Sequence, residues 1–189
     1  MTQQGKNAID LVLAESLIEL SAKKPIDKIT IKEITDKAGV IRPTFYNHFQ
    51  DKYELIEWII KSELLEPIKP LLNAGMIFEA IVLMLNNISA NSVFYKKALK
   101  LDGAVTFNQI AMKCVYEMFM NIISEKSTGK KSKYRWLTPE VISTYYAQSL
   151  CFITEGWIAQ GMDDIEPKEM AEAYMYLITR SMDDILSEL

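Results

Sequence analysis

The sequence predicts an all-α protein of about nine helices, with an N-terminal helix-turn-helix head and a C-terminal helical part. Two observations carry this prediction. Apolar residues recur at three- and four-residue spacing over most of the 189 residues, whereas period-two alternation never persists. Only seven glycines and six prolines are present, too few for the many tight turns of an all-β fold. Apolar residues make up 49% and charged residues 24%, a balance that favours a folded core over disorder.

Caps and breakers support the boundaries of these helices. Thr30 and Asp51 precede apolar stripes and can accept a hydrogen bond from the first turn. Gly39 follows the second stripe as a C-terminal glycine, and Pro139 and Pro167 stand where proline opens a helix. The helices are expected, in order, at residues 6–22, 31–38, 42–49, 51–66, 75–89, 92–101, 105–125, 139–160 and 167–186.

The chain is expected to divide into a head and a C-terminal domain. Pro67 and Pro70 mark the boundary because proline interrupts helical hydrogen bonding. Residues 1–50 would form the helix-turn-helix head, residues 51–66 a connecting helix, and residues 67–189 a domain for dimerisation and for binding an effector or a partner.

Charge, histidine and cysteine content narrow the function. The net charge is −4, yet positions 23–52 hold seven basic against four acidic residues, which predicts one anion-facing surface. One histidine and two cysteines cannot supply the four ligands of a zinc site, and no second base accompanies His48. We therefore expect no metal, no cofactor and no enzymatic activity. Two thiols in apolar runs, no apolar stretch of membrane length and no signal-peptide pattern predict a cytoplasmic protein.

Residues 29–56 carry the most informative motif. Two short helices joined through Gly39 have the length and the turn residue of a helix-turn-helix. At about 100° per residue, Phe45 and Phe49 fall on one side of the second helix and can hold it to the rest of the head. A major groove admits a helix held in this way. Its other positions carry Arg42, Pro43, Thr44, Tyr46, Asn47 and His48.

At these residues the sequence resembles the TetR family of bacterial transcription regulators. The matching segments are ITIKEITDKAGV, beginning at Ile29, and RPTFYNHF followed by DK and EL, beginning at Arg42. The resemblance covers roughly the first 60 residues. It implies a homodimer that binds a double-stranded DNA operator through a three-helix head. It also implies a C-terminal domain that dimerises and usually holds an effector.

The resemblance also assigns contacts by position. It implies that bases are read by Lys32, Arg42, Thr44 and Asn47. It implies that phosphates are contacted by the backbone amide of Ile31 and by the side chains of Thr30, Tyr46, His48 and Lys52. One position departs from the family pattern, because Ile41 stands where a short polar residue usually caps the recognition helix. Pro43 offsets this in part by fixing the first turn.

Control of the regulator is open between two alternatives. Residues 95–103 and 145–174 resemble the family subgroup that includes the activator of dihydroxyacetone-kinase operons, where some members sense a protein partner. Alternatively, a small apolar effector would suit the nine methionines at or beyond Met76, which line an adaptable pocket or simply form core. The candidate pocket residues are Phe78, Met84, Phe107, Met112, Tyr116, Phe119, Gln148 and Phe152.

The last two helices carry more apolar positions than one stripe against a single core needs. We therefore expect them to pair with their copies across a two-fold axis as a four-helix bundle. The expected function is that of a dimeric regulator on a palindromic operator. The candidate interface residues are Tyr146, Leu150, Ile153, Trp157, Met170, Tyr174, Leu177 and Ile178.

Overall fold

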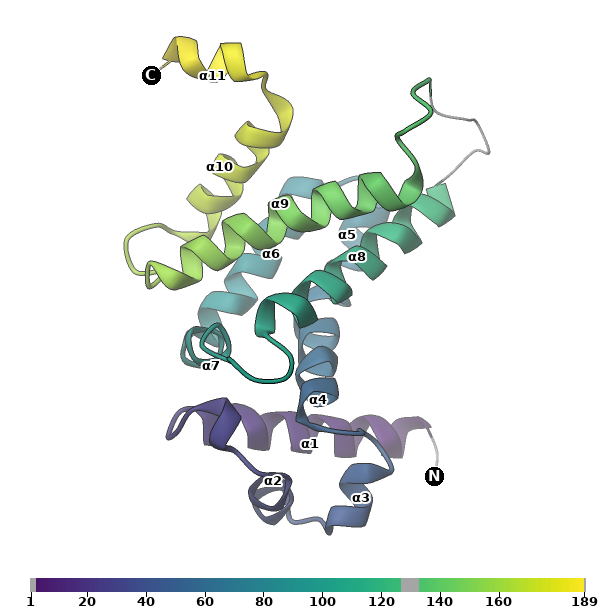
Figure 1. The fold of residues 1–189 in the computed structure, drawn as a ribbon, viewed down its shortest axis with the longest axis vertical. Coiled ribbons are helices and arrows are strands. Elements are labelled where there is room, and N and C mark those ends of the chain that lie inside the picture. Colours follow the sequence, from purple (N-terminus) through teal and green to yellow (C-terminus); the bar gives the residue numbers. More distant parts are fainter. Residues whose placement is uncertain (1–2, 127–132, 189) are drawn as a thin grey trace.

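The computed structural model describes residues 3–126 and 133–188, and within these ranges it contains helices and no strand (Figure 1). The all-α prediction is confirmed. Eleven α-helices occur there, nine of them with seven or more residues. They are α1 (Gln3–Ser21), α2 (Ile31–Ala38), α3 (Arg42–Tyr46), α4 (Lys52–Ile59), α5 (Lys69–Asn73), α6 (Ile77–Ala90), α7 (Ser92–Ala98), α8 (Phe107–Lys126), α9 (Pro139–Ala159), α10 (Pro167–Thr179) and α11 (Met182–Glu188).

The helices form a small group at one end and a larger group at the other. Figure 1 shows α1, α2 and α3 together, with α4 leading away from them into the larger group. In the larger group α8 packs along α9, and α10 packs against α6. One connected set of buried apolar side chains runs through both groups, from Leu13 of α1 to Tyr174 of α10. The position of α1 to α3 is therefore fixed by the same core that holds the C-terminal helices.

The structure differs from the sequence prediction around helix four and its successor. A 3-10 turn, η1 (Ile26–Lys28), precedes α2, and after Ile59 the fourth helix widens into a π-helical segment, η2 (Ile60–Leu65). In this segment the Glu66 amide donates to the Lys61 carbonyl, five residues back, at 2.8 Å. Of the two prolines that follow, Pro67 lies in the turn at 66–68 that separates η2 from α5. Pro70 lies in the first turn of the short helix α5, where a missing N–H breaks no helical bond.

The last predicted helix is divided in two. Arg180 is extended, with φ −107° and ψ 152°, and this ends α10 at Thr179. Ser181 then begins α11: its hydroxyl donates to the Asp184 carboxylate at 2.7 Å and accepts from the Asp184 amide at 3.2 Å. A local capping pair thus outcompetes continuation of the apolar pattern through residue 186.

Two further findings concern membrane-spanning helices and metal sites. In residues 3–126 and 133–188, no single helix is long and apolar enough to cross a membrane, and α6 with α7 passes that test only as a pair bent by 87°. No group of three or more His, Cys, Asp or Glu side chains within the described part of the chain is placed to hold a metal ion.

Candidate nucleic-acid interface

The start of α2 is fixed by a reciprocal capping box. The Thr30 hydroxyl accepts from the Glu33 amide at 3.3 Å, and the Glu33 carboxylate accepts from the Thr30 amide at 2.9 Å. Lys24 lies 2.5 Å from the same carboxylate. Hydrogen bonds lower the pKa of the Glu33 carboxyl to about 2, and the bond from the Lys24 ammonium has the largest effect, before that from the Thr30 amide. These bonds satisfy first-turn donors of α2 and hold the Ile31 amide at an exposed helix start.

The turn between α2 and α3 depends on Gly39. Its φ of 68° lies in the left-handed region, which a residue with a Cβ adopts only at a cost. The Val40 amide donates to the Thr35 carbonyl at 3.0 Å and so closes the end of α2. The chain then begins α3 with Pro43 in its first turn and Ile41, 69% exposed, at the capping position without a side-chain bond. The departure seen in the sequence is therefore present in the structure as an uncapped helix start.

Helix α3 is anchored by one buried face. Phe45 is fully buried, and its ring centroid lies 5.8 Å from that of Phe49, which in turn packs against Trp58 of α4 at 6.4 Å. A five-residue helix is not stable alone, so these aromatic contacts fix its orientation. The opposite face is exposed to solvent, as a surface that meets DNA must be. It carries Arg42, Pro43, Tyr46 and Asn47, with Thr44 partly exposed beside them.

His48 occupies a different environment from the one its sequence position suggests. Its side chain is only 2% exposed, and its Nδ1 lies 2.6 Å from an Oδ1 of Asp10 in α1. The bond ties the turn after α3 to the first helix, 38 residues away. This buried contact gives the His48 side chain a role in positioning α3, and the phosphate contact expected of it from the sequence remains a prediction. Asp10 was missed in the sequence because no local spacing connects it with His48.

Lys52 also has intramolecular partners. Its Nζ donates to the carbonyl oxygens of Ile26, Asp27 and Ile29 at 3.0, 2.7 and 3.2 Å. A lysine ammonium has three protons, and all three are used at the end of η1. The Ile26 carbonyl also accepts from the Ile29 amide at 3.1 Å, so Lys52 adds a second bond to it and joins it to the Asp27 and Ile29 carbonyls. The phosphate contact expected of the Lys52 side chain remains a prediction, beside this structural role.

Ion pairs reduce the basic surface that the sequence predicts. Lys24 pairs with Glu33, Lys28 with Asp27 at 3.3 Å, and Lys37 with Glu19. Among the described residues of this segment, Lys23, Lys32, Arg42 and Lys52 form no ion pair, and Lys52 is bonded to the three carbonyl oxygens instead. Lys32 and Arg42 are both exposed and belong to the two helices of the motif. They are the cations of this surface that remain available to an anionic partner.

The C-terminal helices enclose two neighbouring cavities. The larger, which we call the apolar cavity, has a volume of about 350 Å³ and lies among α5, α6, α8, α9 and α10. The smaller, of about 40 Å³, lies among η2, α6, α7, α8 and α9. Of the predicted pocket residues, Met84 and Phe119 lie at the apolar cavity, and Met84 and Phe107 at the smaller one. Phe78 lines a separate surface depression, and Met112 and Tyr116 are partly buried in α8.

The structure buries and exposes other side chains of α9 and α10 than the sequence predicted. Gln148 and Phe152, predicted to line a pocket, are exposed, Phe152 at 76%. Conversely, Leu150, Trp157 and Tyr174, predicted at a dimer interface, are already buried within one chain. The Trp157 Nε1 donates to the Ile165 carbonyl at 2.9 Å, and the Tyr174 hydroxyl bonds to Ser149 at 3.0 Å. The remaining predicted interface residues are partly buried or, for Leu177, exposed: Tyr146, Ile153, Met170, Leu177 and Ile178.

Comparison with known proteins adds relatives in sequence and in structure. The family profile described as bacterial regulatory proteins, tetR family, matches residues 15–59, and the profile described as a transcriptional regulator C-terminal region matches residues 76–180. The HTH-type dhaKLM operon transcriptional activator DhaS of Lactococcus lactis subsp. lactis is 27% identical over 152 residues, which cover 79% of each chain.

Two solved structures share the fold. The structure of the dihydroxyacetone kinase operon activator DhaS superposes with a TM-score of 0.63 and 22% identity, covering 90% of this chain and 93% of that one. The structure of NalD, described as the secondary repressor of the MexAB-OprM multidrug efflux pump in Pseudomonas aeruginosa, gives a TM-score of 0.59 and 12% identity. It covers 92% of this chain and 96% of NalD. At these identities the likeness concerns the fold alone.

Proposed function

Since the chain belongs to the TetR family of bacterial transcription regulators, we propose that it binds a palindromic DNA operator as a homodimer and responds to a ligand in its C-terminal domain. The observation that carries the DNA part is the exposed face of α3, anchored from behind by Phe45 and Phe49. Such a regulator acts on the bacterial chromosome and so in the cytoplasm.

The contacts proposed for DNA follow from exposure and chemistry. Arg42, at the start of α3, can reach guanine O6 and N7 with two hydrogen bonds. Lys32 and Asn47, which are exposed, and Thr44, which is partly exposed, are the further base contacts in this proposal. Tyr46 is 57% exposed, and with Thr30, the Ile31 amide and the ring of Pro43 it would lie against the sugar-phosphate backbone.

Substitution of Arg42 tests base reading. Arg42→Ala should weaken binding to the operator by about 1–3 kcal/mol for each half-site and weaken binding to random DNA much less. The DNA to titrate is the region upstream of the gene for this chain, at several salt concentrations. Lys23→Ala is the matched control, because Lys23 is an exposed cation that lies outside α2 and α3. An equal loss on every sequence would assign Arg42 to phosphate and leave base reading to Lys32, Thr44 and Asn47.

The dimer interface is proposed on the outer face of α9 together with α10. Tyr145, Gln148 and Phe152 recur at helical spacing on that face, and Tyr145 and Phe152 are 61% and 76% exposed. Leu177 of α10 is also exposed. A large apolar surface of this kind usually meets another protein surface. Phe152→Glu should convert the dimer to a monomer at micromolar concentration in sedimentation experiments. Val93→Glu, at an exposed site on α7, should leave the dimer intact; a dimer in both variants would place the interface elsewhere.

Ligand control would act through the distance between the two heads. A ligand that prefers one packing of the C-terminal helices shifts the population of dimers whose heads fit successive major grooves. The apolar cavity lies against α10 and α9, the proposed dimer helices, and its volume suits the body of a small apolar molecule. Occupation of this cavity would therefore bear on the interface that sets the spacing of the heads.

A partner protein is the second candidate for the controlling ligand. Trp136, 74% exposed, lines a surface depression near the start of α9. Exposed aromatic side chains of this kind are typical anchors of protein interfaces. Trp136→Ala tests this alternative. Loss of regulation in cells, with unchanged dimerisation and operator affinity, would favour a protein partner over an effector in the apolar cavity.

A further inference from the structure

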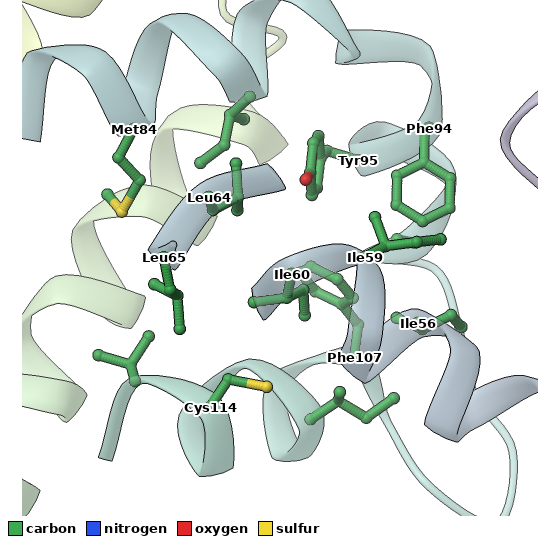
Figure 2. Close-up of a cluster of buried hydrophobic side chains, with 14 of the residues drawn as sticks. Ile56, Ile59, Ile60, Leu64, Leu65, Met84, Phe94, Tyr95, Phe107 and Cys114 are labelled. Carbon is green, nitrogen blue, oxygen red and sulfur yellow. The ribbon is translucent and has the colours of Figure 1, made fainter. Parts of the chain in front are cut away.

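Two residues that line the smaller cavity have buried hydroxyl groups with no hydrogen-bond partner within the described residues. These hydroxyls belong to Tyr95 of α7, whose side chain is fully buried, and to Thr154 of α9. Figure 2 shows the Tyr95 ring between Leu64 and Phe94, with its oxygen directed into the apolar cluster. Burial raises the pKa of the Tyr95 phenol, so the group is a neutral donor and acceptor.

Three buried hydroxyls have no partner among the described residues: those of Tyr95 and Thr154, which both line the smaller cavity, and that of Ser143, which lines neither cavity. The Tyr174 hydroxyl has Ser149, and the Trp157 indole has the Ile165 carbonyl. A threonine inside a helix usually bonds to the carbonyl four residues back, as Thr35 does at 3.0 Å and Thr179 at 2.7 Å. The Thr154 hydroxyl forms no such bond. An unpaired buried hydroxyl costs stability, and two of them beside one cavity would both be accounted for by a bound group that completes them.

The two cavities adjoin one another. Met84 and Leu150 line both, so these two side chains form the wall between the apolar cavity and the pair of hydroxyls. Methionine is flexible and can change rotamer to admit a chain of atoms. The smaller cavity, at about 40 Å³, holds a group of only a few heavy atoms, whereas the apolar cavity holds a larger body. The two volumes together suit an amphipathic molecule with a large apolar body and a small polar end group.

The charged residues around the smaller cavity indicate whether the polar end group of a ligand is charged or neutral. No lysine or arginine is among the described residues that line either cavity. Glu155 is the charged residue at the smaller one, and both its oxygens accept from the Asn108 amide group, at 2.8 and 2.9 Å. A carboxylate or phosphate would therefore be buried without a cation, next to a second negative charge.

We propose that the ligand of the C-terminal domain is an uncharged amphipathic molecule whose hydroxyl or carbonyl end lies between Tyr95 and Thr154. Its apolar part passes Met84 and Leu150 into the apolar cavity. This inference rests on the ligand control proposed above. It makes the two hydroxyls the residues that select the end group of the ligand, and the apolar cavity the site that accepts its body.

The test uses the full chain without DNA and three probes of equal length: 1-octanol, octanoate and octylamine. Calorimetric titration should show that octanol binds and that octanoate and octylamine bind at least tenfold more weakly. Tyr95→Phe and Thr154→Val should each weaken octanol binding by about three- to tenfold, the equivalent of one hydrogen bond. Ser143→Ala is the matched control. Its hydroxyl is also buried and unpartnered, yet Ser143 lines neither cavity, so octanol affinity should stay within twofold.

The melting temperature of the unliganded variants gives a second measure that does not depend on the probe. Tyr95→Phe removes an unsatisfied group and keeps the ring, so the free protein should melt at the same temperature as the parent chain or above it. A lower melting temperature would show that the hydroxyl has a structural partner and would overturn the inference. Preference for octanoate, or equal octanol binding by all variants, would overturn it as well.

Operator titrations separate this inference from the proposed function. If octanol binds as described but leaves operator affinity unchanged, the site stands and ligand control through it fails. If the operator is bound and no probe binds, the DNA-binding proposal stands and the inference about the cavity fails.

Discussion

Lys52→Met separates a structural role from a role in DNA contact. The sequence places Lys52 at a phosphate-contacting position, whereas the structure bonds its ammonium to three carbonyl oxygens at 2.7–3.2 Å. Methionine keeps an apolar stem of similar length and removes the charge and the donors. The substitution should loosen the junction between η1 and α4 and change DNA affinity only through that loosening.

The expected magnitude follows from the three bonds. A hydrogen bond to a charged group contributes about 1.5–3 kcal/mol when it is buried. The bond to the Asp27 carbonyl is exposed and those to Ile26 and Ile29 are partly buried, so water replaces part of the loss. We expect unfolding free energy to fall by about 2 kcal/mol in total. For a chain of this size that corresponds to a decrease of about 4–8 °C in melting temperature.

Thermal melts and operator titrations over a range of salt concentrations decide between the roles. A phosphate contact in each of two protomers would lower the magnitude of the salt slope by about 1.8, from about 0.9 for each contact. For Lys52→Met we expect the lower melting temperature and an unchanged slope. Lys32→Met is the control for stability, since the exposed Lys32 should leave the melting temperature unchanged and, as a proposed base contact, weaken binding to the operator more than to random DNA. A stable Lys52→Met protein with a reduced slope would refute the structural role.

Three further perturbations test the head. The pKa of Glu33 is lowered to about 2 from 4.5, so the stability its carboxylate gives is present above pH 4.5 and is lost as pH falls toward 2; acid melts of the parent chain should lose more stability over this interval than those of Glu33→Gln. Gly39→Ala places a Cβ at φ 68° and should cost about 1–2 kcal/mol in urea unfolding, whereas Gly39→Asn should cost less; equal stability of all three would contradict the strain. Asp10→Ala leaves the buried His48 ring without its partner and should cost about 1–3 kcal/mol, with weaker operator binding at temperatures where the head stays folded.

The helices of the head could be read from the sequence because their determinants are local. The apolar stripe, the Thr30 cap and Gly39 lie within one or two turns of the element that they define, and α2 begins and ends where they predict. The anchoring role of Phe45 and Phe49 followed from helical spacing alone, and both side chains are buried. The family resemblance extended this reading to a proposed function, because the exposed positions of the motif carry the side chains that are proposed to contact DNA.

Tertiary structure alone decided what the polar side chains do and which way the C-terminal helices face. His48 and Lys52 occupy motif positions, yet partners from α1 and η1, distant in sequence, engage their side chains. Helix α9 is apolar on several sides, so periodicity could not tell its buried stripe from its exposed one; packing against α8 placed Leu150 and Trp157 inside and left Phe152 outside. The unpaired hydroxyls of Tyr95 and Thr154 belong to the same class, because a missing partner is a property of the whole packed interior and leaves no mark in the sequence.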